Sequence, residues 1–428
     1  MTHAAVPGPA ASQDVRLRVR AGWLRWALAG TLIAAAAALP ALRFLVFWPG
    51  DQWQVDLEVY REAGVSLLTG RPVYSAMTEA PQLLPFTYPP FAAVLAMPLA
   101  LMPFRVAAWV WLLAQVAANV GIVWYAGYGL IHRRGAADPL ILAALAAPML
   151  WLHPVADGIR FGQVNAFLVL ACLMDLRRPR PRLLRGLPPG MLIGLAMAIK
   201  LTPGVFVVHL LVCRRWREAA TAVGTAVAVT LLAFLWLPES SILFWGGALA
   251  DPARLGPNMG TSNQSIRGVL MRLGPGGTPG VAFWLVLAVL VGWAGFGLAR
   301  RAWQRQDSIT EVAAVGLMAC LLSPVAWIHH FHWIVVVILA LLGADPWRER
   351  RRLLAAGLVL GWFLCRLPWW GISWLVNDWP LEPVGRLLQN ADTLGALVAL
   401  WLLARMLGPS PASAGRGPVL ASDRVGSS

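Results

Sequence analysis

The sequence predicts an all-α integral membrane protein, a polytopic bundle of about 12 spans with short helices on its outer surface. Hydrophobic residues make up 58% of the chain and charged residues only 13%, with a mean hydropathy of +0.64. The arginines behind the net charge of +15 stand in short clusters between apolar runs. This arrangement is typical of membrane topology signals, so we expect no nucleic-acid partner.

Twelve apolar runs are long enough to cross, or nearly cross, a hydrocarbon core of about 30 Å. They lie at 26–47, 106–131, 138–153, 164–176, 187–199, 203–213, 219–237, 281–299, 310–326, 332–344, 353–367 and 393–407. The first is longer than a signal-peptide core and lacks a small-residue cleavage site, so we read it as a span. We therefore expect one transmembrane domain at 26–407, between a basic, disordered cytoplasmic tail at 1–25 and a disordered tail at 408–428.

The charge distribution predicts the orientation of the spans. With both termini in the cytoplasm, the inner face carries 24 arginines and nine acidic residues, and the outer face carries Lys200, ten arginines and 11 acidic residues. This bias is the positive-inside pattern. It also favours reading 187–212 as a hairpin with Lys200 at its outer apex, and 88–103 as a re-entrant or surface helix. The two large outer loops are then 48–105 and 238–280.

Any chemistry must come from loops resting on this bundle. The sequence has no GxGxxG or Walker motif and no segment polar enough for a soluble catalytic domain. Its four cysteines, at the ends of or within apolar runs, lack CxxC spacing, so we expect neither a disulfide nor a metal site from them.

The first outer loop places carboxylates among aromatic residues next to the membrane surface. Asp56 stands between two apolar residues, where partial desolvation would raise its basicity. Such a base could take a proton from a sugar hydroxyl. Its position directly before a short helix expected at 57–68 also suits an N-cap, and the residues alone favour this cap.

Lys200 is the single lysine of the chain and lies between two apolar half-segments. An ammonium is a compact charge suited to a phosphate oxygen. Snorkelling toward lipid headgroups explains it equally well. Ionisable residues within membrane segments are nonetheless functional candidates by default.

Three of the seven histidines, His329, His330 and His332, lie at a predicted outer span junction. Adjacent histidines on a helix point about 100° apart, so they do not form the i, i+4 pair of a zinc site. Hydrogen bonding to a phosphate or sugar and interfacial packing both remain open. Two further polar stretches, 157–165 and 258–268, belong to the same predicted face.

Six short segments stand in series along nearly the whole chain: Asp56–Tyr60, Thr87–Phe91, Gly162–Asn165, Ile199–Pro203, Ser262–Ile266 and Ser323–His330. Together they resemble the glycosyltransferase family 87 enzymes, polyprenol-phosphate-sugar-dependent transferases of the glycosyltransferase C superfamily. Within that family the chain is similar to actinobacterial α-1,2-mannosyltransferases that extend phosphatidylinositol mannosides or branch lipomannan. The resemblance therefore implies a glycosyltransferase C type of bundle.

The resemblance also implies an inverting transfer of mannose from polyprenyl-phosphate-mannose to a hydroxyl, expected to be O2 of mannose, of a lipid-linked acceptor at the outer face. Asp56 occupies the place of the family's catalytic base. Lys200, His329 and His330 are the candidates for the donor phosphate, with Arg61 and Arg160 in reserve. The remaining candidates, expected to bind substrate, are Glu58, Tyr60, Tyr88, Gln163, Asn165, Asn263, Gln264 and Trp327.

We expect no metal and no other cofactor, because cations would surround the phosphate and the chain has no DxD motif. The expected partners are the lipid-linked donor, a glycolipid acceptor and membrane lipids, with the donor tail in a groove between spans. Two alternatives stay open: an arabinofuranosyltransferase using decaprenyl-phosphate-arabinose, and a transporter of lipid-linked sugars. A transporter should place its ionisable residues near the bilayer midplane and show repeat symmetry.

Overall fold

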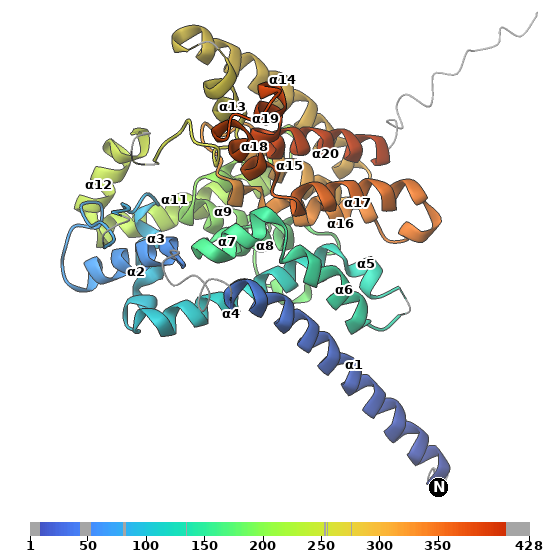
Figure 1. Cartoon of the computed structure of the whole chain (residues 1–428). Coiled ribbons are helices and arrows are strands. Elements are labelled where there is room, and N and C mark those ends of the chain that lie inside the picture. The colour runs from blue at the N-terminus through green and yellow to red at the C-terminus, as the bar shows by residue number, and fades with distance from the viewer. Residues whose placement is uncertain are drawn as a thin grey trace, which may run out of the picture.

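The computed structural model describes residues 9–42, 53–79, 83–133, 135–251, 254, 256–274 and 276–407, and most of these residues are in helices (Figure 1). The helices are α1 (Pro9–Leu42), α2 (Val55–Leu68), α3 (Pro90–Ala100), α4 (Phe104–Ala126), α5 (Tyr128–Ile131), α6 (Pro139–Met149), α7 (His153–Phe161), α8 (Asn165–Leu176), α9 (Met191–Ile199), α10 (Val205–Val212), α11 (Trp216–Trp236), α12 (Pro238–Gly246), α13 (Ile266–Leu273), α14 (Gly277–Gln304), α15 (Ser308–Leu321), α16 (Ile334–Leu342), α17 (Arg350–Leu364), α18 (Leu367–Val376), α19 (Glu382–Gln389) and α20 (Ala391–Leu407). Short 3₁₀ turns are η2 (Arg182–Leu184), η3 (Thr202–Gly204), η4 (Ala248–Ala250), η6 (Ile328–Trp333) and η7 (Pro346–Arg348).

Helices dominate because a helix satisfies its own backbone hydrogen bonds, which a lipid surrounding cannot do. The centre of the bundle is α15 and α16, whose side chains are buried on nearly every side. By contrast, α11 and α14 present large apolar side chains outward, including Leu235 at 82% and Trp293 at 80% exposure. An apolar exterior around an apolar centre is the pattern of a membrane protein.

Three of the described helices are long and apolar enough to cross a membrane, namely α4, α11 and α14. Counting each bent pair as one span raises the number to six. These pairs are α6 with α7, bent by 78°, α17 with α18, bent by 45°, and α19 with α20, bent by 64°. The structure therefore agrees with a helical membrane bundle, whereas the count of about 12 spans stays a prediction.

The N-terminal helix differs from the prediction. The sequence suggested a disordered tail at 1–25 followed by a span from Trp26, but α1 is already helical at Pro9 and ends at Leu42. It projects away from the bundle (Figure 1) and is tied to the region of α6 by Arg25, whose guanidinium donates to the Asp138 carboxylate at 2.8 Å. Residues 1–8 and 43–47, and the predicted tail at 408–428, lie outside the described residues.

The stretch expected to be re-entrant or on the surface contains α3, which has 11 residues. At 1.5 Å per residue it is about 16 Å long, roughly half of a hydrocarbon core. It packs closely on α2, because a Cβ at Gly64 would lie only 2.8 Å from the carbonyl oxygen of Ala96. This contact joins the two helices of the segment 48–105 to each other.

The structure contains the predicted hairpin around Lys200. At the start of α9, a Cβ on Gly190 would touch the Glu218 carbonyl near the start of α11, and α10 returns to the same end at Cys213. Lys200 lies at the opposite end, where it donates to Asn165. The basic runs before and after this hairpin therefore meet on one side of the bundle.

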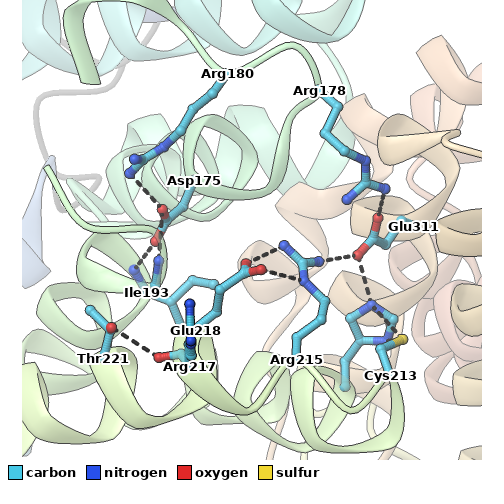
Figure 2. A network of polar contacts seen from close by, with 12 residues as sticks. Asp175, Arg178, Arg180, Ile193, Cys213, Arg215, Arg217, Glu218, Thr221 and Glu311 are labelled. Atoms are coloured by element: carbon cyan, nitrogen blue, oxygen red, sulfur yellow. Dashed lines mark hydrogen bonds and ion pairs between the residues drawn. The ribbon is translucent and has the colours of Figure 1, made fainter. Parts of the chain in front are cut away.

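Those runs form a network of buried ion pairs (Figure 2). Glu311 of α15 is completely buried and is contacted by Arg178, by Arg215 at 2.9 Å and by His209 at 2.8 Å. Arg215 also pairs with Glu218. Because one buried carboxylate joins helices α10, α11 and α15, the network fixes the roots of the Lys200 hairpin.

A second carboxylate, Asp175 at the end of α8, holds the start of α9. It accepts hydrogen bonds from the backbone N–H groups of Gly190 and Ile193 at 3.0 and 3.1 Å, and it pairs with Arg180 at 3.1 Å. The exposed N-terminal donors of a helix favour such an anion. The hairpin is therefore anchored at both of its roots.

Replacing Glu311 with Ala should destabilise the protein by about 3 kcal/mol, because two half-buried guanidinium groups and the buried His209 would lose their shared partner. Thermal unfolding of the protein in detergent measures this. Glu349→Ala removes a surface carboxylate that pairs with Arg352 and is 48% exposed, so it should cost less than about 1 kcal/mol. Equal effects of the two substitutions would contradict the role assigned to Glu311.

Candidate active site

Four segments far apart in the sequence meet at the end of the bundle opposite the Glu311 network. They are the first turn of α2 with Asp56, the turn between α7 and α8 with Gln163, the apex of the hairpin with Lys200, and η6 with His330. Hydrogen bonds connect Asp56 to Gln163 and Lys200 to His330. The structure thus brings together the central residues that the sequence singled out.

Asp56 does not cap its helix. The cap residue is Gln54, in a left-handed conformation with φ of 56°, and no side chain caps this terminus. Asp56 lies one residue inside the helix, which begins earlier than the predicted 57–68, and its Oδ2 accepts from Gln163 Nε2 at 2.6 Å. The N-cap prediction was therefore wrong, although the first helical turn still favours a negative charge.

The surroundings of Asp56 make its carboxylate more basic. Burial raises the pKa of Asp56 to about 6, and the Gln163 hydrogen bond and the charge of Lys200 oppose this rise without cancelling it. Burial disfavours the charged form because water no longer solvates it. A carboxyl group with such a pKa can accept a proton near neutral pH.

Gln163 connects Asp56 to two tyrosines. Its Oε1 lies 3.3 Å from the hydroxyl of Tyr88 and 3.5 Å from that of Tyr60, and the two hydroxyls are 2.9 Å apart. The rings meet edge to face, with centroids 5.1 Å apart. The residues expected to bind substrate are therefore hydrogen-bonded to one another and to the proposed base.

Lys200 is surrounded by polar and aromatic partners. Its Nζ donates to Asn165 Oδ1 at 3.1 Å, lies 3.0 Å from His330 Nε2 and stands 5.3 Å from the centre of the Tyr88 ring. Its charge also acts on Asp56. The side chain therefore points into the bundle rather than toward lipid headgroups.

The histidines lie around this lysine in distinct roles. His330 lies between two donors, with its Nδ1 3.3 Å from the backbone N of Trp327 and its Nε2 3.0 Å from the Lys200 ammonium. The buried His329 offers its backbone carbonyl to Asn165, and its Nε2 has no hydrogen-bond partner within the described part of the chain. His332 bonds to Asn119 inside the bundle.

Asn263 and Gln264 hold the histidine segment in place. Asn263 Oδ1 accepts from the backbone of Ser265 and Ala326, and its Nδ2 donates to a carbonyl. Gln264 donates to two carbonyls through its Nε2, and its backbone N–H bonds to Ala326. Both side chains are fully buried and bond to other groups of the protein, and their expected part in substrate binding stays a prediction.

Three other candidates lie outside the cluster around Lys200. Arg61 donates to the Met102 carbonyl, and Glu58 accepts from the backbone of Glu79 at 3.3 Å. The Arg160 guanidinium lies 5.0 Å from the centre of the Phe161 ring, which in turn contacts the His329 ring. Of the two reserve arginines, Arg160 is the one connected to the histidines.

An apolar groove of about 220 Å³ opens beside the polar cluster. Its walls are Tyr60, Tyr88, Trp111, Phe167, Ile199 and the apolar face of α3. Ile199 immediately precedes Lys200 in the chain. A molecule that carries a phosphate on a hydrocarbon chain could therefore place both parts at once.

Two residues of α4 that the sequence analysis did not select support the turn at Gln163. Trp111 Nε1 donates to the Gly162 carbonyl at 2.7 Å, and Gln115 Nε2 donates to the carbonyls of Gly158 and Gln163 at 3.0 and 2.8 Å. A polar residue within a predicted span could have indicated Gln115. Nothing in the local sequence distinguished Trp111 from the other tryptophans.

Comparisons with known proteins identify the family of the chain. The model of glycosyltransferase family 87 matches residues 86–324. A polyprenol-phosphate-mannose-dependent alpha-(1-2)-phosphatidylinositol mannoside mannosyltransferase of Mycobacterium tuberculosis is 33% identical over 369 residues, which cover 81% of this chain and 82% of that protein.

Two relatives are named as polyprenol-phosphate-mannose-dependent alpha-(1-2)-phosphatidylinositol pentamannoside mannosyltransferases. The one from Mycobacterium tuberculosis is 33% identical over 338 residues, or 76% of this chain and 73% of the relative. The one from Mycolicibacterium smegmatis is 33% identical over 360 residues, or 81% and 82%. No solved structure matches the chain. The family match and these relatives, which span most of the sequence, place the chain in glycosyltransferase family 87, and it is accordingly a glycosyltransferase.

Proposed function

We propose that this glycosyltransferase is an inverting mannosyltransferase that uses polyprenyl-phosphate-mannose. The acceptor is a phosphatidylinositol mannoside or lipomannan, extended at O2 of a mannose, at the outer face of the cell membrane. The names of the relatives support the donor and the acceptor class. The observation that carries the proposal is the meeting of a basic carboxylate, Asp56, with the single lysine beside an apolar groove.

In a single displacement the acceptor oxygen attacks C1 of mannose as the bond from C1 to the phosphate oxygen breaks. Asp56 takes the proton of the attacking hydroxyl. The donor is a phosphodiester with one negative charge, and the released polyprenyl phosphate carries two. The charge lost by Asp56 on protonation therefore appears on the leaving phosphate.

Lys200 is suited to stabilise that growing charge. Its ammonium interacts electrostatically with Asp56 and is held by Asn165 Oδ1 at 3.1 Å and by His330 Nε2 at 3.0 Å. Fixed donors aimed at a developing negative charge stabilise the transition state more than the ground state. Because side chains neutralise the phosphate, the proposed reaction needs no divalent metal and no other cofactor.

The groove beside Tyr88 and Ile199 suits the first part of the prenyl chain. In the donor this chain begins directly at the phosphate, so the two binding regions must be adjacent. The acceptor differs, because its reacting sugar is separated from its acyl chains by the rest of the headgroup. We therefore assign the groove to the donor.

Two alternative functions make different predictions. An arabinofuranosyltransferase would add a pentose, and a transporter would move a lipid-linked sugar without forming a glycosidic bond. The named mannosyltransferase relatives favour mannose over arabinose. The mass of the product distinguishes the three functions, since transfer of mannose adds one hexose to the acceptor.

Asp56→Asn should reduce mannosyl transfer by about 10²–10⁴-fold, because the amide cannot accept the hydroxyl proton. Membranes containing the variant are supplied with radiolabelled polyprenyl-phosphate-mannose and a defined phosphatidylinositol mannoside. The label measures the rate of transfer, and mass spectrometry measures the mass of the product. Glu58→Gln is the matched control, because Glu58 lies two residues away and bonds only to the Glu79 backbone among the contacts described. Retained transfer by Asp56→Asn would disprove the assigned base.

The transfer rate should fall on acidification with a midpoint near pH 6, because burial raises the pKa of Asp56 to about 6 and only its ionised form can act as a base. Above this pH the carboxylate is ionised and the rate reaches a plateau. Initial rates at saturating donor between pH 4.5 and 7.5 measure the transition. A rate that stays constant down to pH 4.5 would contradict the proposed titration.

Lys200→Met should lower kcat/KM for the donor by about 10²-fold, as expected for the loss of one charge-stabilising donor. Arg61→Met serves as the comparison. It removes a cation of the same outer loop whose guanidinium is directed to the Met102 carbonyl, and it should leave kcat/KM nearly unchanged. If kcat/KM fell further in Arg61→Met than in Lys200→Met, Arg61 and not Lys200 would be the cation that stabilises the leaving phosphate.

A further inference from the structure

We propose that Gln163 is a positioning residue for the reaction. Together with Tyr60 and Tyr88 it holds one oxygen of Asp56 and leaves the other free to act as the base. This inference rests on the proposed function, in which Asp56 takes the acceptor proton. It replaces the substrate-binding role that the sequence suggested for these three residues.

The hydrogen-bond network determines how the Gln163 amide is oriented. Its nitrogen lies 2.6 Å from Asp56 Oδ2, and its oxygen faces the hydroxyls of Tyr88 and Tyr60 at 3.3 and 3.5 Å. In the reversed orientation the amide oxygen would meet a carboxylate oxygen, so two acceptors would repel each other at contact distance. The carboxylate therefore makes Gln163 a donor to Asp56, which leaves the amide oxygen to accept from the tyrosine hydroxyls.

The hydroxyls of Tyr60 and Tyr88 make hydrogen bonds within the protein. The rings of Tyr60 and Tyr88 border the apolar groove, while both hydroxyls bond to each other and to Gln163. A hydrocarbon chain in the groove has no group that could bond to a hydroxyl. We therefore assign the phenol oxygens to the hydrogen-bond network of the base Asp56 and the rings to the wall of the groove.

The frame around Gln163 is rigid at both ends of its bond to Asp56. Trp111 and Gln115 fix the carbonyls of the turn from one side. From the other side, Gly162 has a φ of 73°, and a Cβ there would lie 2.9 Å from the Cβ of Leu57, the residue after Asp56. The turn therefore rests directly on the first turn of α2.

This geometry assigns separate tasks to the two carboxylate oxygens. Oδ2 is directed to Gln163, so Oδ1 is the oxygen available to the acceptor hydroxyl. A carboxylate that rotates freely would present the correct oxygen for only part of the time. Since misplacement of a reacting group by about 1 Å costs on the order of 10²-fold in rate, fixing its rotation supports catalysis.

The experiment compares Gln163→Leu with the unchanged protein across pH. The charged and titratable groups that face Asp56 are Lys200, Tyr60 and Tyr88, with His330 behind the lysine. All of them remain in the variant. A change in the acid limb of kcat, the pH range in which kcat falls on acidification, is therefore caused by the loss of the Gln163 amide. The Gln163 bond lowers the pKa of Asp56, and its removal should move that limb to higher pH.

We expect kcat of Gln163→Leu to fall by about 10-fold to 100-fold, with little change in KM for the donor. Gln264→Leu is the matched control. It removes another fully buried glutamine with several hydrogen bonds, and it should lower the amount of folded enzyme without moving the acid limb. The position of the limb does not depend on how much enzyme is active.

The double variant Tyr60→Phe/Tyr88→Phe tests the network a second way, because it keeps the rings that line the groove and removes only the hydroxyls. It should shift the acid limb in the same direction as Gln163→Leu. An unmoved limb in both variants would overturn the inference, as would a raised KM with unchanged kcat in Gln163→Leu, which indicates substrate binding. The proposed function fails separately, if Asp56→Asn retains transfer.

Discussion

A charged side chain can remain inside an apolar bundle only where partners compensate the loss of water, and this constraint organises the whole molecule. Among the polar clusters of the described residues, one surrounds Glu311 and another contains Asp56 and Lys200. Helices α8 and α9 connect them and have 12 and nine residues, which corresponds to about 18 and 14 Å. The ion pairs at one end thereby set the position of the lysine at the other.

The carboxylates of the two clusters differ in how far their negative charge is compensated by partners. Glu311 is enclosed by two arginines and a histidine, so its charge is matched and its role is structural. Asp56 receives one hydrogen bond from a neutral amide and a more distant influence from Lys200. Incomplete compensation keeps this carboxylate basic, which is the property that a proton acceptor needs.

The aromatic residues between the polar cluster and the groove connect two chemical requirements of a lipid-linked substrate. Such a donor joins a phosphate to a long hydrocarbon chain, so a suitable site must change from charged to apolar within a few ångströms. Tyr88 lies at the boundary between the charged and the apolar part of the site, and its side chain contacts both. Its ring borders the groove and lies 5.3 Å from the Lys200 ammonium, while its hydroxyl bonds to Gln163.

The sequence by itself determined the membrane class and the hairpin at Lys200, and it singled out Asp56 as the candidate base, because apolar runs, charge clusters and short motifs are local properties. It did not determine where α2 begins, and the residues around Asp56 taken alone favoured an N-cap that the structure does not contain. Nor did it separate Gln163, which bonds to Asp56, from Gln264, which serves only backbone and neighbouring groups. These roles depend on partners 107 and 125 residues away. Only the packing of the helices decides which distant groups come within hydrogen-bond distance, so the tertiary structure was needed to assign them.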